Sequence, residues 1–397
     1  MGLKPGYKQT EVGVIPEEWA ISTVGREFEI QLGKMLDVEK NRGVLKPYLG
    51  NKAVQWNRID VGDLPTVAMS PSDLKRFRLL PGDLLVCEGG EVGRAAIWEG
   101  PFDECYYQKA LHRLRPRRGF DPRLMVELLR YWSDHGLLAN YVTQTSIAHL
   151  TREKLADVPM PVPPHEEQRA IAGALGDVDA LIAALDQLIA KKGELKRAAM
   201  QQLLTPPAPG QARQTRLPGF SGEWEVKRLG EIALLYQPVT ISAKQFTESG
   251  YPVYGANGVV GFYREFNHNN WQVTVTCRGS TCGTVNRTVD RCWITGNAMV
   301  VNCDNREDVD KSFLYYLLLS RDLSICITGT GQPQIVRGPL ADFSITFPAN
   351  KIEQAAIAAV LSDMDAEIAA LERRLAKTRA LKQGMMQELL TGRTRLI

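Results

Sequence analysis

Polar side chains that could recognise nucleic-acid bases gather in two loop-like stretches of this chain. Arginine pairs with guanine, and asparagine or glutamine with adenine, through two hydrogen bonds in the major groove. Lysine, serine and threonine more often contact phosphate. The candidates in the first half of the chain are Asn51, Lys52, Gln55, Asn57, Arg58, Arg94, Gln144 and His149. The candidates in the second half are Asn257, Arg278, Ser280, Thr281, Gln332 and Gln334.

Two glycine-rich turns carry several of these candidates. They lie within PGDLLVCEGGEVGRAAIWEG at 81–100 and WQVTVTCRGSTCGTV at 271–285, where β-prone runs flank the turn and predict strand, turn, strand. One interpretation is a tight hairpin that needs only the backbone freedom of glycine. The other is a loop that carries Glu91 and Arg94, or Arg278, Ser280 and Thr281, towards DNA. Neither turn matches a phosphate-binding P-loop or a dinucleotide-binding GxGxxG motif.

Catalytic and metal-binding motifs are not evident. The histidines show no metal-ligand spacing, and the seven cysteines include no CxxC pair, so we expect buried free thiols and no metal. No NPPY-like or NPPF-like methyltransferase motif and no Walker lysine occurs. Asp177 and Asp179, which match Asp363 and Asp365, are expected to form salt bridges or subunit contacts. The sequence predicts a chain that is not itself an enzyme and needs no cofactor.

Length and charge limit the remaining possibilities. A chain of 397 residues can form two or three domains with their own cores. The net charge of +3 means that any DNA-binding surface is a local patch. RLRPRR at 113–118 is either such a patch or a solvated strand end. No apolar stretch has the length of a membrane span or of a signal peptide, so we expect a cytoplasmic protein without membrane contact.

The chain repeats itself, which explains why the candidates occur in two groups. An offset of 186 aligns residues 167–205 with 353–391 without a gap, and 22 of 39 positions are identical. Upstream, Trp19 and Gly25 match Trp224 and Gly230, and Leu155-Ala156-Asp157 matches Leu340-Ala341-Asp342. VCEGGEVGR at 86–94 aligns with TCRGSTCGT at 276–284, with Cys87 on Cys277. The intervening stretches differ far more, which suggests two binding specificities on one scaffold.

Each repeat ends in a long helix with a heptad seam. Apolar residues recur at alternating steps of four and three, which is typical of helices that pack on one another. The seam residues are Ile171, Leu175, Val178, Ile182, Leu185 and Ile189 in the first helix, and Ile357, Leu361, Met364, Ile368, Leu371 and Leu375 in the second. About 40 residues at 1.5 Å each make each helix about 60 Å long. Antiparallel pairing of the two helices is the simplest arrangement, and a bundle with a partner's helix is the alternative.

These observations predict a mixed α/β (α+β) fold with an internal pseudo-two-fold repeat. Two β-rich domains, each with a curved, mainly antiparallel sheet, are joined by two long helices that form an antiparallel coiled coil. The expected boundaries are a first domain at 1–160, a first helix at 161–205, a linker at 206–216, a second domain at 217–348 and a second helix at 349–397.

The ordered double set of motifs resembles the specificity subunit of type I restriction-modification systems. The resemblance rests on EEWAISTVG and GEWEVKRLG, on YPVYGANGVVGF, on the junctions that begin LADVPMPVPPHEEQRAIAGAL and LADFSITFPANKIEQAAIAAV, and on MQQLLT and MQELLTGRTRL. It covers essentially the full chain. The first junction has Pro163-Pro164-His165 where the second has Ala349-Asn350-Lys351, so the two helix starts differ in sequence.

The resemblance implies a protein that recognises a split site in double-stranded DNA, one domain for each half-site. It also implies that the helices set the spacing and dock two methylation subunits that bind S-adenosylmethionine, with restriction subunits further out. The alternative is a coiled-coil scaffold whose arms bind proteins or glycans, and a nuclease is a third possibility. A steep dependence of DNA affinity on salt would separate DNA binding from the scaffold.

Overall fold

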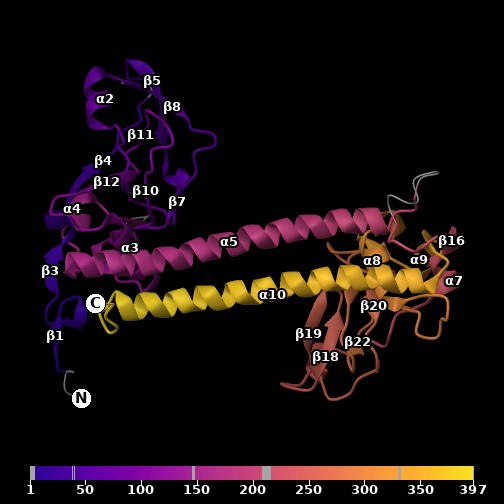
Figure 1. Ribbon diagram of the computed structural model, residues 1–397. Helices are drawn as coiled ribbons and strands as arrows, with labels where there is room; N and C mark the ends of the chain where they lie inside the picture. Colours follow the sequence, from indigo (N-terminus) through magenta and orange to yellow (C-terminus); the bar gives the residue numbers. More distant parts are fainter. Residues whose placement is uncertain are drawn as a thin grey trace. The chain divides into compact units, whose positions relative to one another are not determined.

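The structure, a computed structural model, contains two compact units, each built from one globular arm and parts of both long helices (Figure 1). Unit 1 comprises Met1–Leu185 and Arg374–Ile397, and unit 2 comprises Asp186–Arg373. The structure describes residues 5–37, 39, 41–144, 148–207, 216–329 and 332–396, without the side chains of 143, 144 and 148. Most of the expected linker, residues 208–215, lies outside the described residues. We call the globular part of unit 1 arm 1 and that of unit 2 arm 2.

Arm 1 is built on a four-stranded antiparallel sheet and a smaller second sheet. The strand order in the first sheet is β10 (Ala95–Ile97), β9 (Leu84–Cys87), β12 (Leu111–Pro116) and β4 (Phe28–Leu32). The second sheet has the order β11 (Tyr106–Tyr107), β5 (Val44–Leu49) and β8 (Thr66–Met69), and β11 pairs with β5 in parallel. Strands β9 and β12 have long runs of buried residues because helix α3 (Pro122–Asp134) and the second sheet cover them.

Arm 2 repeats this topology. Its first sheet has the order β17 (Leu234–Tyr236), β23 (Ala298–Asn302), β20 (Val273–Thr276) and β21 (Val285–Arg287). The second sheet has the order β19 (Gly258–Tyr263), β18 (Tyr251–Gly255) and β22 (Trp293–Ile294), again with one parallel pair. Helix α8 (Lys311–Leu319) takes the place of α3. The expectation of mainly antiparallel sheets therefore holds for the larger sheet of each arm.

Short helices join each arm to the strand that precedes its long helix. In arm 1 these are α1 (Val24–Glu27) and α4 (Arg152–Ala156), and in arm 2 they are α7 (Leu229–Ile232) and α9 (Arg337–Ala341). A Cβ added at Gly25 would lie 2.8 Å from Cβ of Ala156, and one at Gly230 would lie 3.0 Å from Cβ of Ala341. This close helix contact is the physical reason for glycine at both positions, and it confirms that Gly25 and Gly230 correspond.

The remaining strands form two-stranded pairs. They are β1 (Tyr7–Thr10) with β2 (Gly13–Pro16), β3 (Ala20–Thr23) with β15 (Pro159–Val162), and β16 (Trp224–Arg228) with β26 (Ser344–Pro348). The pairs β3–β15 and β16–β26 hold the start of each arm against its last strand. The last strand leads directly into a long helix.

The long helices are α5 (His165–Leu203) and α10 (Lys351–Leu389). A buried glutamine marks each helix start: Gln168 accepts the backbone N–H of Asp121 at 3.0 Å, and Gln354 accepts that of Asp310 at 2.8 Å. Each amide also donates to a proline carbonyl just before the helix. Because these positions differ by the repeat offset of 186, the same side chain anchors each helix to its arm.

The two helices pack antiparallel within each unit. In unit 1, Asp179 of α5 meets Lys382 of α10 at 2.6 Å, while Glu167 further back on α5 meets Arg395 beyond the end of α10. In unit 2, Lys192 pairs with Glu367, and Lys196 further along pairs with Asp365. In both units the residue number on α5 rises as the number of its partner on or beyond α10 falls, so the two helices run in opposite directions. With two β-rich arms and two packed long helices, the predicted fold class is confirmed.

The seam residues of both helices lie at buried or partly buried positions. Ile171 and Leu175 join the core of unit 1 together with Met386 and Leu389 from the end of α10. Ile357 and Leu361 join the core of unit 2 with Leu203 and Leu204. The partly buried seam residues are Val178, Ile182, Ile189, Met364, Ile368 and Leu371, while Leu185 and Leu375 are buried. The start of each helix is thus part of an arm's core, and the central turns are covered only in part.

Candidate nucleic-acid interface

Three segments converge at one edge of arm 2. They are the two-residue turn 256–257 between β18 and β19, the loop 277–284 between β20 and β21, and the hairpin formed by β24 (Ile327–Thr328) and β25 (Gln334–Ile335). Oγ1 of Thr276 donates to the carbonyl of Ala256, which ties the turn to the loop. The backbone N–H of Ile335 donates to the carbonyl of Cys277 at 2.9 Å, and Arg278 and Gln334 pair in an antiparallel bridge. We call this set of segments the arm 2 loop cluster.

The polar side chains of the arm 2 loop cluster are available to a ligand. Four of the six candidates are exposed and two are half-buried. Within the described part of the chain, none of the six side chains forms a hydrogen bond or ion pair. The structure thus brings together all the candidates of the second half of the chain: Asn257, Arg278, Ser280, Thr281, Gln332 and Gln334.

Arm 1 has an equivalent cluster with the same backbone connections. The loop 88–94 between β9 and β10 meets the hairpin of β13 (Thr143–Gln144) and β14 (Ala148–His149). The N–H of Leu150 donates to the carbonyl of Glu88 at 2.8 Å, and Gly89 bridges His149. Sγ of Cys87 donates to the carbonyl of Asn51, as Thr276 does to Ala256 in arm 2. We call these segments, together with residues 51–59, the arm 1 loop cluster.

Hydrogen bonds divide the arm 1 candidates into two groups. Asn51 donates to the carbonyl of Gly89 at 2.9 Å, and Arg94 donates to the carbonyl of Asn51 at 3.0 Å, so both side chains hold the loop together. Asn57 donates to Glu127 and Asp179, which directs its amide towards α3 and α5. These bonds give Asn51, Asn57 and Arg94 structural roles within arm 1.

Lys52 and Arg58 are exposed and form no ion pair within the described part of the chain. They lie on a short insertion that replaces the two-residue turn of arm 2, namely η1 (Asn51–Ala53), β6 (Val54–Gln55) and β7 (Arg58–Ile59). Gln55 donates to the carbonyl of Lys52 within this insertion. His149 is half-buried, and the side chain of Gln144 lies outside the described residues.

The backbone corrects one detail of the predicted repeat. In arm 1, Cys87 exchanges backbone hydrogen bonds with Gly93 and Arg94, and in arm 2 Thr276 does so with Gly283 and Thr284. Cys87 therefore corresponds to Thr276, and the expected match with Cys277 is wrong by one residue. The left-handed glycines agree, at 90 and 93 in one loop and at 279 and 283 in the other. Because the arm 2 loop has one more residue between them, an ungapped alignment could not find the shift.

The corrected register changes which residues are equivalent. The two antiparallel bridges place Arg278 at the position of Gly89 and Gln334 at the position of His149. Arm 2 therefore has an arginine and a glutamine at two positions where arm 1 has a glycine and a histidine. Identical backbone connections thus display different hydrogen-bonding groups.

A buried histidine lies below the arm 1 loop cluster and was not a candidate. Nε2 of His112 lies 2.8 Å from the carbonyl of Leu150, which can only accept, so Nε2 carries the proton. Burial lowers the pKa of His112 below its usual value. The pairing of β12 with β9 and of β23 with β20 places Met299 at the equivalent position in arm 2. The histidine thus supports β14 from inside the fold.

The basic run at 113–118 is partly structural. Arg113 is buried and pairs with Glu29 at 3.0 Å, and Arg115 binds Asp83 through two nitrogens. Arg117 and Arg118 are exposed at the end of β12. Arg118 nevertheless contacts the buried carboxylate of Glu27 at 3.5 Å, so three of the four arginines pair with carboxylates of arm 1, and the interpretation as a strand end accounts for most of the run.

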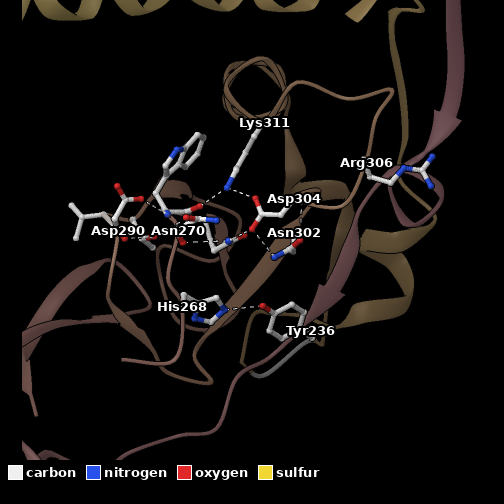
Figure 2. A network of polar contacts seen from close by, with 12 residues as sticks. Tyr236, His268, Asn270, Asp290, Asn302, Asp304, Arg306 and Lys311 are labelled. Carbon is white, nitrogen blue, oxygen red and sulfur yellow. Dashed lines mark hydrogen bonds and ion pairs between the residues drawn. The ribbon is translucent and has the colours of Figure 1, made fainter. Parts of the chain in front are cut away.

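A polar network closes the opposite end of the arm 2 sheet from its loop cluster (Figure 2). Asp304, just beyond β23, pairs with Lys311 at the start of α8 and accepts a hydrogen bond from Gln272 at 2.7 Å. Burial opposes ionisation of Asp304, but hydrogen bonds from Lys311 and Gln272 outweigh it and lower the pKa of this carboxyl. Nearby, the hydroxyl of Tyr236 bonds Nε2 of His268 at 2.7 Å. The charged groups of this network are therefore paired within arm 2, and the network fixes the loop before β20.

Neither a metal-binding group nor a membrane-crossing helix occurs among the described residues. Among them, no group of three or more His, Cys, Asp or Glu side chains could hold a metal ion. No helix in the described ranges combines the length and apolarity that crossing a bilayer requires. The seven cysteines are free thiols, and burial raises the pKa of Cys87 and of Cys303 to about 11.

Known proteins share both the sequence pattern and the fold. A family model described as "Type I restriction modification DNA specificity domain" matches residues 16–192 and again residues 221–378. The chain is 24% identical over 418 residues to the putative type I restriction enzyme MjaX specificity subunit of Methanocaldococcus jannaschii, covering 98% of this chain and 97% of that protein. It is 25% identical over 305 residues to the MjaVIII specificity subunit of the same organism, covering 69% and 72%.

Solved structures show the same fold at low sequence identity. The S subunit of a type I restriction-modification system from M. genitalium matches with a TM-score of 0.65 and 16% identity, over 98% of this chain and 99% of that one. A structure from work on complex assembly and conformational transition of the type I R-M system matches with a TM-score of 0.56 and 19% identity, over 95% and 99%. The chain belongs to the type I restriction-modification specificity family and is a DNA specificity subunit, not the catalytic subunit of such a system.

Proposed function

We propose that each arm reads one half of a split site in double-stranded DNA through its loop cluster. The observation that carries the proposal is the equivalence of the two clusters: the same backbone hydrogen bonds hold loops that display different polar side chains. Sequence-specific readers need a rigid frame and exchangeable groups that bond base edges. A frame present twice in one chain supplies two such surfaces, which suits a bipartite site.

The residues proposed to contact DNA lie in the two loop clusters. In arm 2 they are all six members of the loop cluster, and in arm 1 Lys52, Arg58, Gln55, Gln144 and His149 remain candidates. Lys52 and Arg58 are suited to phosphate, since they are exposed cations on a protruding insertion. Asn51, Asn57 and Arg94 contribute by shaping the arm 1 loop cluster, because their polar atoms are used within it.

The long helices are proposed to dock two methylation subunits, which bind S-adenosylmethionine, and to set the spacing between the half-sites. Support comes from α5, where Leu181, Leu188 and Leu195 are 39, 38 and 47% exposed. Their spacing of seven residues places them on one face of the helix, as a helical partner requires. Restriction subunits are proposed to join the complex beyond the methylation subunits. The domain boundaries expected from the sequence remain the proposed boundaries between the domains that read DNA and the helices that dock the methylation subunits.

Methylation of genomic DNA tests the proposal. Cells that express this chain with its methylation subunit should carry methylated bases within one split motif, detectable by single-molecule sequencing, and cells lacking this chain should not. Absence of any split motif would overturn the proposal.

A binding titration adds a physical test. For the assembled complex, log Kd should rise with log salt concentration by about 0.9 for each phosphate contacted. A flat response would exclude backbone contacts and favour a scaffold whose arms bind proteins or glycans.

A further inference from the structure

Two residues of the arm 2 loop cluster are placed so that each could read one base of the half-site. This inference rests on the proposed function. We propose that Arg278 and Gln334 form a base-reading pair, in which Arg278 contacts guanine and Gln334 contacts adenine at neighbouring positions of one half-site. The hairpin β24–β25 carries Gln334 into the major groove beside the loop that carries Arg278.

The first step of the argument is that the two side chains leave the same face of the sheet. Arg278 and Gln334 are directly opposite one another in an antiparallel bridge. Opposed residues in such a pair have Cβ atoms about 4.5–5.5 Å apart and on one face. Their chain neighbours Cys277 and Ile335, only 1 and 2% exposed, point to the other face and into the core. The alternation of strand side chains therefore directs Arg278 and Gln334 away from the core.

The second step is that both side chains lack a bonding partner in the described part of the chain, while their backbones are held by hydrogen bonds. Neither forms a side-chain hydrogen bond or ion pair with the described part of the chain. Their backbones are held, because Ile335 N–H donates to Cys277 and Thr328 Oγ1 donates to the carbonyl of Gln334. A fixed backbone below a free side chain lowers the ordering cost of binding.

The third step is that their chemistry matches adjacent base pairs. The guanidinium fork of arginine fits O6 and N7 of guanine, and the amide of glutamine fits N6 and N7 of adenine. The major groove admits a two-stranded β-ribbon, and the Cβ spacing exceeds the rise of about 3.4 Å between successive bases by only about 1–2 Å. Long side chains span the small difference.

Arm 1 cannot read the same two bases in this way. Its residues at the equivalent positions are Gly89, which has no side chain, and His149. The two half-sites should therefore differ at the positions that Arg278 and Gln334 contact. This difference arises from two residues on a shared backbone.

Selection from a randomised duplex library tests the assignment, with the full chain bound to its methylation subunit. The Arg278→Lys variant keeps the positive charge but loses the bidentate fork. It should lose guanine preference at one position by about 5- to 150-fold while its salt dependence stays the same. The Gln334→Glu variant should change one adenine to cytosine, because a carboxylate accepts from N4 of cytosine.

Two controls keep the outcome interpretable. The half-site read by arm 1 should be unchanged in every variant, which provides a control within the same molecule. Glu307→Gln, at an exposed residue just beyond β23 and outside the loop cluster, should leave both guanine and adenine preferences intact. Thermal melting should show that all three variants fold, since no described contact of these side chains is lost.

The outcomes separate the two proposals. If the wild-type complex selects no split motif, the proposed function itself fails. If it selects one and Arg278→Lys or Gln334→Glu weakens binding without changing any base preference, the two residues contact backbone and the base-reading pair is overturned. A changed base in the half-site of arm 1 would also overturn it.

Discussion

Individual polar residues of the loop clusters fall into those that build the loop and those that face solvent. Asn51 and Arg94 are near-ideal base readers by residue type, yet each is bound to backbone carbonyls or a neighbouring carboxylate of its own arm. Arg278 and Gln334 have no such partner in the described part of the chain. By residue type alone, Asn51, Arg94, Arg278 and Gln334 are equally good candidates for reading bases. Only their hydrogen bonds distinguish the first two from the last two.

His112 provides a prediction at the residue scale. Its pKa is lowered in the folded state, so below about pH 6.5 the unfolded chain binds a proton that the folded chain does not. Stability contributed by neutral His112 is therefore present above about pH 6.5 and is lost as pH falls towards the folded pKa. His112→Met, which copies Met299 of arm 2, should cost about 1 kcal/mol at pH 8 for the lost hydrogen bond. It should also reduce the loss of melting temperature between pH 7.5 and 5.5, measured by calorimetry.

His165→Gln is the control for this experiment, because His165 is exposed at the start of α5. A change in pH dependence that His165→Gln shares with His112→Met would not be assigned to His112. An unchanged pH dependence in His112→Met would contradict the assigned cause. Burial also lowers the pKa of His268, so unit 2 is expected to keep its own loss of stability in acid in the His112→Met variant.

At the scale of elements, buried ion pairs join the helices to the arms. Glu167, fully buried at the start of α5, accepts hydrogen bonds from Trp19 at 2.8 Å and from Arg395 at 2.5 and 2.9 Å. Arg216 binds Glu353 in the same manner at the start of α10. Glu167 and Glu353 differ by the repeat offset, so the residues after one helix stabilise the start of the other.

Removal of Arg395 tests this contact. Arg395→Met leaves a buried carboxylate with Trp19 as its only remaining partner among those described, which should cost about 3 kcal/mol. For a unit of this size the melting temperature should fall by roughly 6–12 °C. Arg393→Met is the matched control, because Arg393 is 57% exposed and lies 3.8 Å from Glu388. Equal melting temperatures for the two variants would show that the buried pair contributes little.

Lys382 gives a second prediction for the helices. Its side chain is only 4% exposed, and Nζ lies 2.9 Å from Glu127 and 2.6 Å from Asp179. Lys382→Met should destabilise unit 1 by about 3–5 kcal/mol because two neighbouring carboxylates lose their cation. Adding Glu127→Gln should recover part of this loss, with a coupling energy of about 0.5–3 kcal/mol in chemical denaturation.

Lys377→Met serves as the comparison for Lys382, since Lys377 is exposed on the same helix. It should change stability by less than about 0.5 kcal/mol. Strict additivity of Lys382→Met and Glu127→Gln would refute the coupling. In unit 2, Tyr316 takes the place of Glu127 and donates to Asp365 at 2.8 Å. Removal of the equivalent lysine in unit 2 would therefore leave one carboxylate without its cation, where removal of Lys382 leaves two.

At the scale of the whole molecule, the proposed role of the helices is to set a distance. Insertion of one heptad into both α5 and α10 adds about 10 Å, since each helical residue rises 1.5 Å. The proposal expects the spacer of the split motif to lengthen by about three base pairs, with both half-sites unchanged. Methylation patterns in cells that carry the altered chain measure this directly. A motif with its original spacer would refute the role in spacing.

The sequence by itself determined the duplication, the two long helices, the fold class and the family. These features depend on periodic apolar residues and on identities repeated at a fixed offset, which are local and survive without three-dimensional information. The matches of Gly25 with Gly230 and of the glutamines at the helix starts belong here. These matches can be found from the sequence because each repeat makes the same close contact and therefore needs the same residue.

Only the tertiary structure decided which polar residues are free and how the two loops correspond. The partners of Asn51, Asn57 and Arg94 lie 38, 70 and 43 positions away in the chain, so spacing in the sequence could not reveal them. The extra residue in the arm 2 loop became visible through the backbone hydrogen bonds that close each loop, between Cys87 and Arg94 in arm 1 and between Thr276 and Thr284 in arm 2. That shift makes Arg278 equivalent to Gly89, and the bridge to Gln334, which is equivalent to His149, could be found only in three dimensions.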